Sequence, residues 1–217
     1  MRVGTPGWPC PAPTGRAPAP AAAAAQAGAA PGQPESQPDY PDLQQHLAEL
    51  DRRGLLQRIE HPVDKDAELH PLVRWQFVGG MQEAERKAFL FTNIVNAQGR
   101  RYSMDVVVGA LAANREIYSV GMGAPVQDIQ KRWDHAIQNP IAPKLVQKAV
   151  CQEVVWKGDD LLGEGRGLDM LPIPVSTPGF DSAPTLTATN VITVDPQTGV
   201  QNMGTYRCAL KASDRLV

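Results

Sequence analysis

Periodic apolar positions begin near residue 42 and predict a series of short helices and strands. Leucines at positions 43, 47 and 50 recur at helical spacing, Asp42 can cap that helix and Gly54 can end it. Three more helices are predicted from the apolar period and from flanking stop signals, over Asp64–Phe77, Asn114–Val120 and Val126–Gln138. Short apolar runs predict strands at Leu55–Glu60, Ala88–Phe91, Met104–Val108 and Gln152–Lys157.

The last part of the chain, from Thr185, has the pattern of a β-hairpin. Threonine and valine dominate the run Leu186–Val194, and a second β-rich run, Val200–Leu210, follows after the turn Asp195–Gly199. Proline near the start of this turn and glycine at its end are typical of a five-residue hairpin loop. Strict alternation would place five residues of the first run on one face, namely Leu186, Ala188, Asn190, Ile192 and Val194.

This order of elements predicts an α+β protein. Helix, strand and helix come first, strands and helices are then mixed, and the end is rich in β-structure, which disfavours a doubly wound Rossmann sheet. The glycines in Gly121-Met122-Gly123 lack the spacing of a dinucleotide-binding loop.

Composition excludes several classes of function. The 217 residues are 42% hydrophobic and 20% charged, with a net charge of −2, so no basic footprint for nucleic acid is present. Cys10, Cys151 and Cys208 are odd in number and far apart, which argues against a disulfide framework and indicates a reducing, cytoplasmic location. No apolar run approaches 18 residues, so no membrane-spanning segment is expected.

Residues 1–41 differ in composition from the rest of the chain. They are rich in proline and alanine, and they contain too little apolar surface to offset the entropy of ordering. Arg2 and Arg16 are their only basic residues, and a leucine-rich core of a signal peptide is missing. We therefore expect a disordered, linker-like tail.

The second run of the hairpin carries the candidate chemistry. Hydrogen-bonding side chains crowd around Gly204, and a glycine inside a strand either weakens it or marks a bulge or the close approach of a ligand. Asn202 and Arg207 are five residues apart, so a straight strand would place them on opposite faces. If both serve one ligand, the chain must bend near Gly204. On composition alone, a half-exposed strand with no ligand is the competing interpretation.

Four segments, in this order, resemble the central part of the UbiD-like decarboxylases. They are Leu171-Pro172-Ile173-Pro174, Phe180-Asp181, Asp195-Pro196-Gln197-Thr198-Gly199 and Asn202-Met203-Gly204-Thr205-Tyr206-Arg207. Members of this family use prenylated FMN to remove CO₂ from aromatic or α,β-unsaturated carboxylic acids. The resemblance covers the chain from about Asp42 to its end, and it is looser before the hairpin.

The resemblance implies a domain organisation and a set of site residues. Residues 42–150 would form the small N-terminal α/β domain, and residues 151–217 would begin the split β-barrel that binds prenylated FMN. Asn202 matches a ligand of the Mn²⁺ or Mg²⁺ ion that bridges the flavin phosphate, and hard cations of this kind prefer oxygen ligands. Arg207 matches the catalytic arginine beside the flavin ring, whose planar fork can hold a carboxylate. Met203, Thr205 and Tyr206 match positions that contact the cofactor, mostly through backbone.

The same resemblance implies further partners. These are a small carboxylic acid as substrate, K⁺ as an additional ion, a flavin prenyltransferase that supplies the cofactor, and a second copy of the chain in a homo-oligomer.

The chain also departs from the family pattern. The second metal ligand, a histidine about twenty residues after the asparagine, and the acidic groups that protonate the product would all fall after Val217. We therefore expect this chain to be an inactive N-terminal fragment of a longer carboxy-lyase. A flavin-binding redox module and a non-catalytic subunit are the alternative interpretations.

Overall fold

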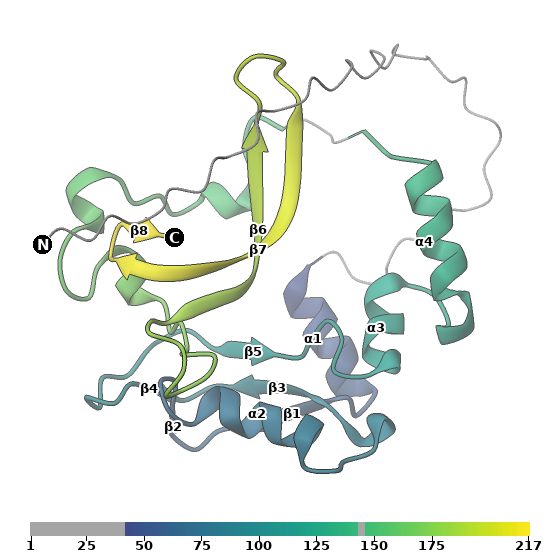
Figure 1. Ribbon diagram of the computed structural model, residues 1–217, viewed down its shortest axis with the longest axis horizontal. Helices are drawn as coiled ribbons and strands as arrows, with labels where there is room; N and C mark the ends of the chain where they lie inside the picture. Colours follow the sequence, from purple (N-terminus) through teal and green to yellow (C-terminus); the bar gives the residue numbers. More distant parts are fainter. Residues whose placement is uncertain (1–41, 143–145) are drawn as a thin grey trace, which may run out of the picture. The chain divides into compact units, whose positions relative to one another are not determined.

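The computed structural model describes residues 42–142 and 146–217, so the tail predicted over residues 1–41 lies outside the described residues. The helices of this part are α1 (Leu43–Arg52), α2 (Leu69–Val78), α3 (Arg115–Met122) and α4 (Ile129–Gln138), together with the short 3₁₀ turns η1 (Glu83–Glu85), η2 (Val126–Asp128), η3 (Val150–Gln152), η4 (Gly158–Leu161) and η5 (Gly167–Met170). The strands are β1 (Leu56–Ile59), β2 (Val63–Asp64), β3 (Ala88–Phe91), β4 (Ile94–Val95), β5 (Val106–Val108), β6 (Thr185–Val194), β7 (Gln201–Ala212) and β8 (Arg215–Leu216). The predicted α+β class is confirmed (Figure 1).

Helix α1 forms where the leucine spacing predicts it. The Asp42 carboxylate accepts a hydrogen bond of 2.9 Å from the backbone N–H of Gln45, which satisfies one of the free donors at the helix start. Leu47 and Leu50 are buried on the inner side of α1, whereas Leu43 is exposed. After the helix, Gly54 takes the positive φ of +70° that the turn into β1 requires.

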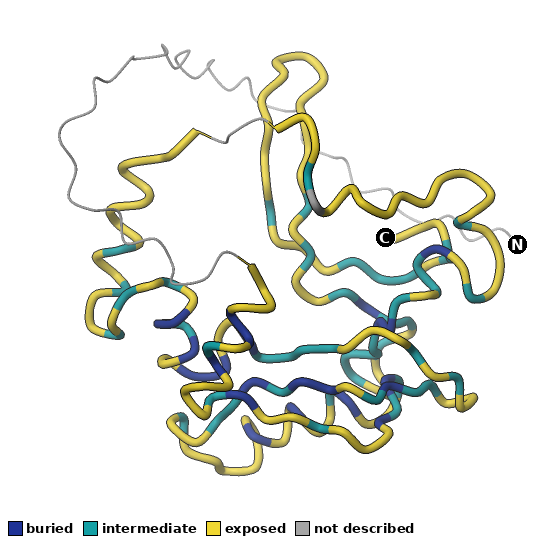
Figure 2. Tube along the Cα trace, turned by 180° about the vertical axis from the view of Figure 1, so that it is seen from behind, coloured by how far each residue is buried: buried dark blue, intermediate teal, exposed yellow. Residues whose placement is uncertain are grey.

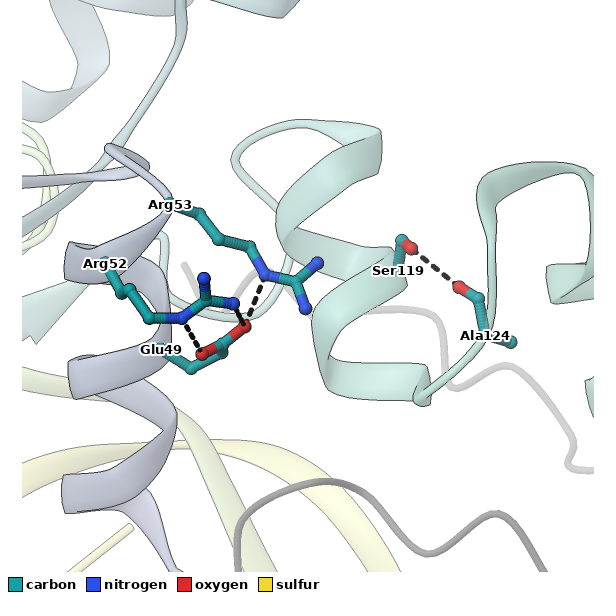
Figure 3. Close-up of polar contacts among 5 residues, drawn as sticks. All are labelled: Glu49, Arg52, Arg53, Ser119 and Ala124. Atoms are coloured by element: carbon teal, nitrogen blue, oxygen red, sulfur yellow. Dashed lines mark hydrogen bonds and ion pairs between the residues drawn. The ribbon is translucent and has the colours of Figure 1, made fainter.

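The last turn of α1 carries a small charge cluster, drawn in Figure 3. Glu49 accepts hydrogen bonds from Arg52 at 2.5 and 2.7 Å and from Arg53 at 2.5 Å. These bonds, first from Arg52 and then from Arg53, lower the pKa of Glu49 to about 2. The carboxylate therefore stays ionised in neutral and mildly acidic solution.

A three-stranded sheet in the order β1-β3-β5 separates two apolar clusters. Strand β3 pairs in parallel with β1 and antiparallel with β5. Because successive side chains of a strand point to opposite faces, Ala88 and Leu90 join the cluster of α1 and α3, whereas Phe91 joins the cluster of α2. Figure 2 shows the buried positions gathered on these strands and on the helices beside them.

Helix α3 is bounded by side-chain hydrogen bonds at both ends. Asn114 accepts from the backbone N–H of Ile117 at 2.8 Å and so caps the first turn. At the other end Gly123 is left-handed, and the Ser119 hydroxyl donates to the Ala124 carbonyl at 2.6 Å (Figure 3). The predicted helix over Asn114–Val120 is therefore confirmed, two residues longer at its C-terminal end.

Some of the predicted elements are wrong in part or in whole. The helix predicted over Val126–Gln138 begins only at Ile129, after the turn η2. Helix α2 begins at Leu69 and not at Asp64, because Val63 and Asp64 form strand β2 instead. The backbone N–H groups of Val63 and Lys65 donate to the carbonyls of Asn93 and Val95. The predicted strand over residues 152–157 is absent, and Val154 and Val155 are exposed. A strand is stable only beside a partner strand, and nothing in the described part pairs with this segment.

The hairpin of β6 and β7 is confirmed. Asp195 accepts at its side chain from the backbone N–H groups of Gln197 and Thr198, at 2.7 and 3.0 Å, and the bonds from Thr198 and then Gln197 lower its pKa. Gly199 closes the turn with a φ of +69°. Between Leu186 and Thr189 the register of β6 shifts, so the predicted single face from Leu186 to Val194 is wrong, because the shift interrupts the alternation.

Within residues 42–142 and 146–217, no helix combines the length and the apolar character that a bilayer crossing requires.

Candidate functional site

The residues singled out from the sequence all lie on β7, between Asn202 and Arg207. The side chains of Asn202, Met203, Thr205, Tyr206 and Arg207 are exposed. Neither the Asn202 amide nor the Arg207 guanidinium has a hydrogen-bond or ion-pair partner among the described residues. These groups are therefore open to a ligand.

The strand divides the site residues between its two faces. Met203 pairs with Ile192 and Thr205 with Asn190, and the Thr205 hydroxyl donates to the Asn190 amide oxygen at 3.2 Å. Arg207 belongs to this face by alternation. Asn202, Gly204 and Tyr206 lie on the other face, so the expectation that a straight strand separates Asn202 from Arg207 agrees with the ladder.

If Asn202 and Arg207 serve one ligand, the sequence predicts a bend near Gly204, but the strand pairing shows no irregularity there. Pairing is regular from Gln201 to Tyr206, and Gly204 is not among the glycines with positive φ. The irregularity lies on the partner strand β6. Leu186 pairs with Cys208 and Thr189 pairs with Tyr206, so β6 has one residue more than β7 between these two pairs. A bulge bends and twists the ladder where the extra residue sits, and Figure 1 shows both strands of the hairpin curving. The deformation is thus opposite Arg207.

Gly204 leaves room for an aromatic ring. A Cβ built on Gly204 would lie 2.9 Å from Cζ and 3.0 Å from the hydroxyl oxygen of Tyr206, and it would also collide with Cε2. The ring of Tyr206 therefore folds back along the strand and covers the glycine. The sequence offers a signal for this arrangement, because the two residues are two positions apart and share a face.

The outer edge of β7 is unpaired beside the site. Strand β8 and Val217 pair with β7 only from Ala209 onward, so in the described part the edge from Gln201 to Cys208 meets no second strand. An unpaired edge presents backbone N–H and C=O groups to whatever lies beside it. A ligand placed there can touch both faces.

A second polar cluster, which sequence reasoning missed, joins the segment before β6 to the N-terminal part. Arg100 donates to Asp169 at 2.9 Å, and Asp169 also accepts from the backbone N–H of Gly165 at 2.6 Å. The Gly165 N–H, followed by Arg100, lowers the pKa of Asp169. Arg100 and Lys65 lie 5.0 and 5.7 Å from the ring centre of Tyr102. No local pattern connects residues 69 positions apart, so only the folded chain shows this contact.

An open depression of about 370 Å³ lies beside Asp169. Residues of the η4–η5 connection and of the end of β7 line it, among them Glu164, Asp169 and Lys211. It does not include any residue from Asn202 to Arg207.

Metal-binding side chains do not gather in the described residues. In that part no group of three histidine, cysteine or carboxylate side chains could hold an ion. The role of Asn202 at a metal therefore stays a prediction.

Comparison with known proteins identifies the class to which this fold and this motif belong. Residues 47–137 match the 3-octaprenyl-4-hydroxybenzoate carboxy-lyase N-terminal domain, and residues 144–217 match the Rift-related domain of the same enzymes. Six residues separate the two matches, which together cover well over half of the chain. The chain belongs to the UbiD family.

Solved structures of the family share the fold. HmfF from Pelotomaculum thermopropionicum, in complex with FMN, is 31% identical, with a TM-score of 0.64 over 80% of this chain and 35% of that chain. An evolved dimeric form of HmfF in complex with prFMN is 27% identical, with a TM-score of 0.60 over 80% and 36%. The apo 3,4-dihydroxybenzoic acid decarboxylase from Enterobacter cloacae is 27% identical, with a TM-score of 0.66 over 81% and 36%. This chain spans about a third of the length of these proteins.

Proposed function

We propose that this chain supplies the N-terminal part of a prenylated-FMN-dependent carboxy-lyase, which removes CO₂ from an aromatic or α,β-unsaturated carboxylic acid. One observation carries the proposal. Along strand β7, the Asn202 amide and the Arg207 guanidinium are exposed and have no hydrogen-bond or ion-pair partner among the described residues. They lie next to an unpaired strand edge, in a chain that belongs to the UbiD family.

The donor set fits a flavin nucleotide. Asn202 and Tyr206 offer neutral amide and hydroxyl groups on one face of β7, and Arg207 offers a permanent positive charge on the other. A long ligand that crosses the unpaired edge can place its phosphate near Asn202 and its ring near Arg207. Backbone groups of Met203, Thr205 and Tyr206 border that route. Asn202 and Arg207 lie on opposite faces of β7. A ligand that passes over the unpaired edge of the strand can reach both of them without a bend at Gly204.

Arg207 would hold the substrate carboxylate. Its guanidinium presents parallel N–H donors to two carboxylate oxygens, and it keeps its charge at every working pH. Fixing the carboxylate sets the direction in which the bond to CO₂ breaks. Prenylated FMN, when bound, supplies the electron sink for that bond.

Asn202 would hold the phosphate end, through Mn²⁺ or Mg²⁺. An amide oxygen is a suitable ligand for either ion, and the remaining ligands must come from the phosphate, from water and from residues beyond the described part. A bound K⁺, a flavin prenyltransferase as cofactor supplier, self-association into a homo-oligomer and a cytoplasmic location belong to the same proposal.

The test uses the complete protein encoded by the gene, produced together with a flavin prenyltransferase. We expect the absorbance spectrum of prenylated flavin in the purified protein and release of CO₂ from at least one member of a panel of aromatic and acrylic acids. The 217-residue chain alone should release none, because a general acid is worth about 10²–10⁴-fold and its proposed position lies outside this chain. Ordinary FMN with redox turnover and no CO₂ release would instead indicate a flavin-binding redox module, and the absence of any flavin would favour a non-catalytic subunit.

A further inference from the structure

We propose that the phenol hydroxyl of Tyr206 is a second contact, beside the Asn202 amide, for the phosphate group of the flavin nucleotide. This inference rests on the proposed function. It assigns a specific side-chain role to a residue whose family position implies a contact mostly through backbone.

The position of the ring is the first step. The far edge of the Tyr206 ring, and not its base, occupies the space above Gly204, because Cε2, Cζ and the hydroxyl oxygen are its atoms nearest to a Cβ built there. The hydroxyl therefore lies one strand repeat back from its own Cα. A hydroxyl in this place lies on the face of β7 that also carries Asn202.

The distance to Asn202 is the second step. Gly204 and Asn202 are neighbours on the same face of β7, and alternate residues of a strand are about 6.6 Å apart. A hydrogen bond of about 2.7–3.0 Å from the hydroxyl can therefore reach a phosphate that the Asn202 amide oxygen holds through its metal ion. Tyr206 is 54% exposed, so the space above the ring is open.

The hydroxyl is free to make this contact. Within the described part of the chain it has no hydrogen-bond partner, and packing over Gly204 requires only the ring. A phenylalanine would cover the glycine equally well. The hydroxyl thus adds a donor on the Asn202 face, where the strand neighbours across the ladder, Thr193, Val191 and Thr189, carry no charge.

Binding of FMN and of riboflavin, which lacks the phosphate, separates this role from packing. In the complete protein, Tyr206→Phe should weaken FMN binding by roughly 10- to 100-fold, the range for a hydrogen bond to a charged group, and leave riboflavin binding unchanged. Tyr206→Leu, which also removes the ring, should weaken both. Tyr118→Phe is the matched control, because its hydroxyl accepts from Trp133 at 2.6 Å, away from the hairpin, and it should change neither.

Gly204→Ala tests whether the position of the Tyr206 ring over Gly204 is needed. Its added Cβ must displace the hydroxyl, so it should lower FMN affinity about as much as Tyr206→Phe, and the double substitution should lose no more than Gly204→Ala alone. Additive losses would show that the cofactor itself approaches Gly204, and this would overturn the inference.

The two proposals fail in different ways. If the unmodified protein binds FMN and Tyr206→Phe binds it equally well, the phosphate contact is wrong and the proposed function stands. If the unmodified protein binds no flavin, both are wrong.

Discussion

At the scale of single residues, the two ends of the motif should fail differently when they are changed. In the complete protein, Arg207→Lys keeps a positive charge but loses the planar fork, so cofactor content should be retained while the rate of CO₂ release drops. Asn202→Ala removes a ligand of the phosphate–metal site, so cofactor content should fall first and activity only as a consequence. Flavin absorbance per protein, measured beside CO₂ release, distinguishes the two. If Asn202→Ala keeps its full cofactor content and its full rate of CO₂ release, Asn202 has no role at the metal.

Thr189 provides a second prediction at this scale. It pairs with Tyr206 across the ladder, and its hydroxyl oxygen is buried without a hydrogen-bond partner among the described residues. An unsatisfied buried polar atom costs about 1–3 kcal/mol, so Thr189→Val should raise the free energy of unfolding of the 217-residue chain by about 1 kcal/mol. Thr193→Val, an exposed position on the same strand, is the control and should change it by less than about 0.5 kcal/mol. Destabilisation by Thr189→Val in urea titrations would show that the hydroxyl has a partner.

At the scale of elements, the packing of α1 predicts unequal costs for two leucines. Leu50, on the inner side of α1, is fully buried in the apolar cluster that includes Ala88 and Leu90 of the sheet. Leu43, at the start of the same helix, is 51% exposed. Leu50→Ala should lower the free energy of unfolding by about 2–5 kcal/mol through lost contacts and a residual cavity. Leu43→Ala should cost less than about 0.5 kcal/mol. Equal costs in denaturant titration would mean that α1 does not pack as described.

The contact between Arg100 and Asp169 predicts a pH dependence. The pKa of Asp169 is lowered in the folded chain, chiefly by the Gly165 N–H, so its contribution to stability is complete above the ordinary aspartate pKa of about 3.9 and is lost as the pH falls through the lower folded value. Both side chains are about a third exposed, so the pair is worth only about 0.2–1 kcal/mol after solvent screening.

Asp169→Asn should therefore be less stable than the unmodified chain at about pH 6, and the difference should shrink as the pH falls below the ordinary aspartate pKa of about 3.9. Melting temperatures across this range test the prediction. Asp159→Asn removes the same charge from an exposed position and serves as the control for the change in net charge. A constant difference between Asp169→Asn and the unmodified chain at all pH values would exclude ionisation of Asp169 as the cause.

At the scale of the whole molecule, the proline- and alanine-rich tail is predicted to be dispensable. Residues 1–41 have no apolar periodicity that could form a core. Limited proteolysis should remove them, and the melting temperature of the remainder should stay within about 1–2 °C. Protection of the tail from a protease, or a large loss of stability after its removal, would contradict the prediction.

Local chemistry explains which elements could be recognised from the sequence. The cap at Asp42, the leucine spacing of α1, the cap at Asn114 and the turn Asp195–Gly199 act through residues within four or five positions of one another. Their hydrogen bonds in the folded chain are the ones that those residue types make wherever they occur. The short motifs from Leu171 to Arg207 are equally local, and their order along the chain is enough to indicate the UbiD family.

Contacts between residues that are distant in the sequence explain which features of the fold could not be predicted from it. Strand β2 exists because β4 accepts its hydrogen bonds, and the predicted strand at residues 152–157 is absent because no described strand pairs with it. The bulge lies on β6 instead of at Gly204, and the ring of Tyr206 takes the space that the glycine leaves. Arg100 meets Asp169 across 69 positions. Each of these features depends on which residues lie next to each other in the folded chain. A local sequence pattern carries no information about such neighbours.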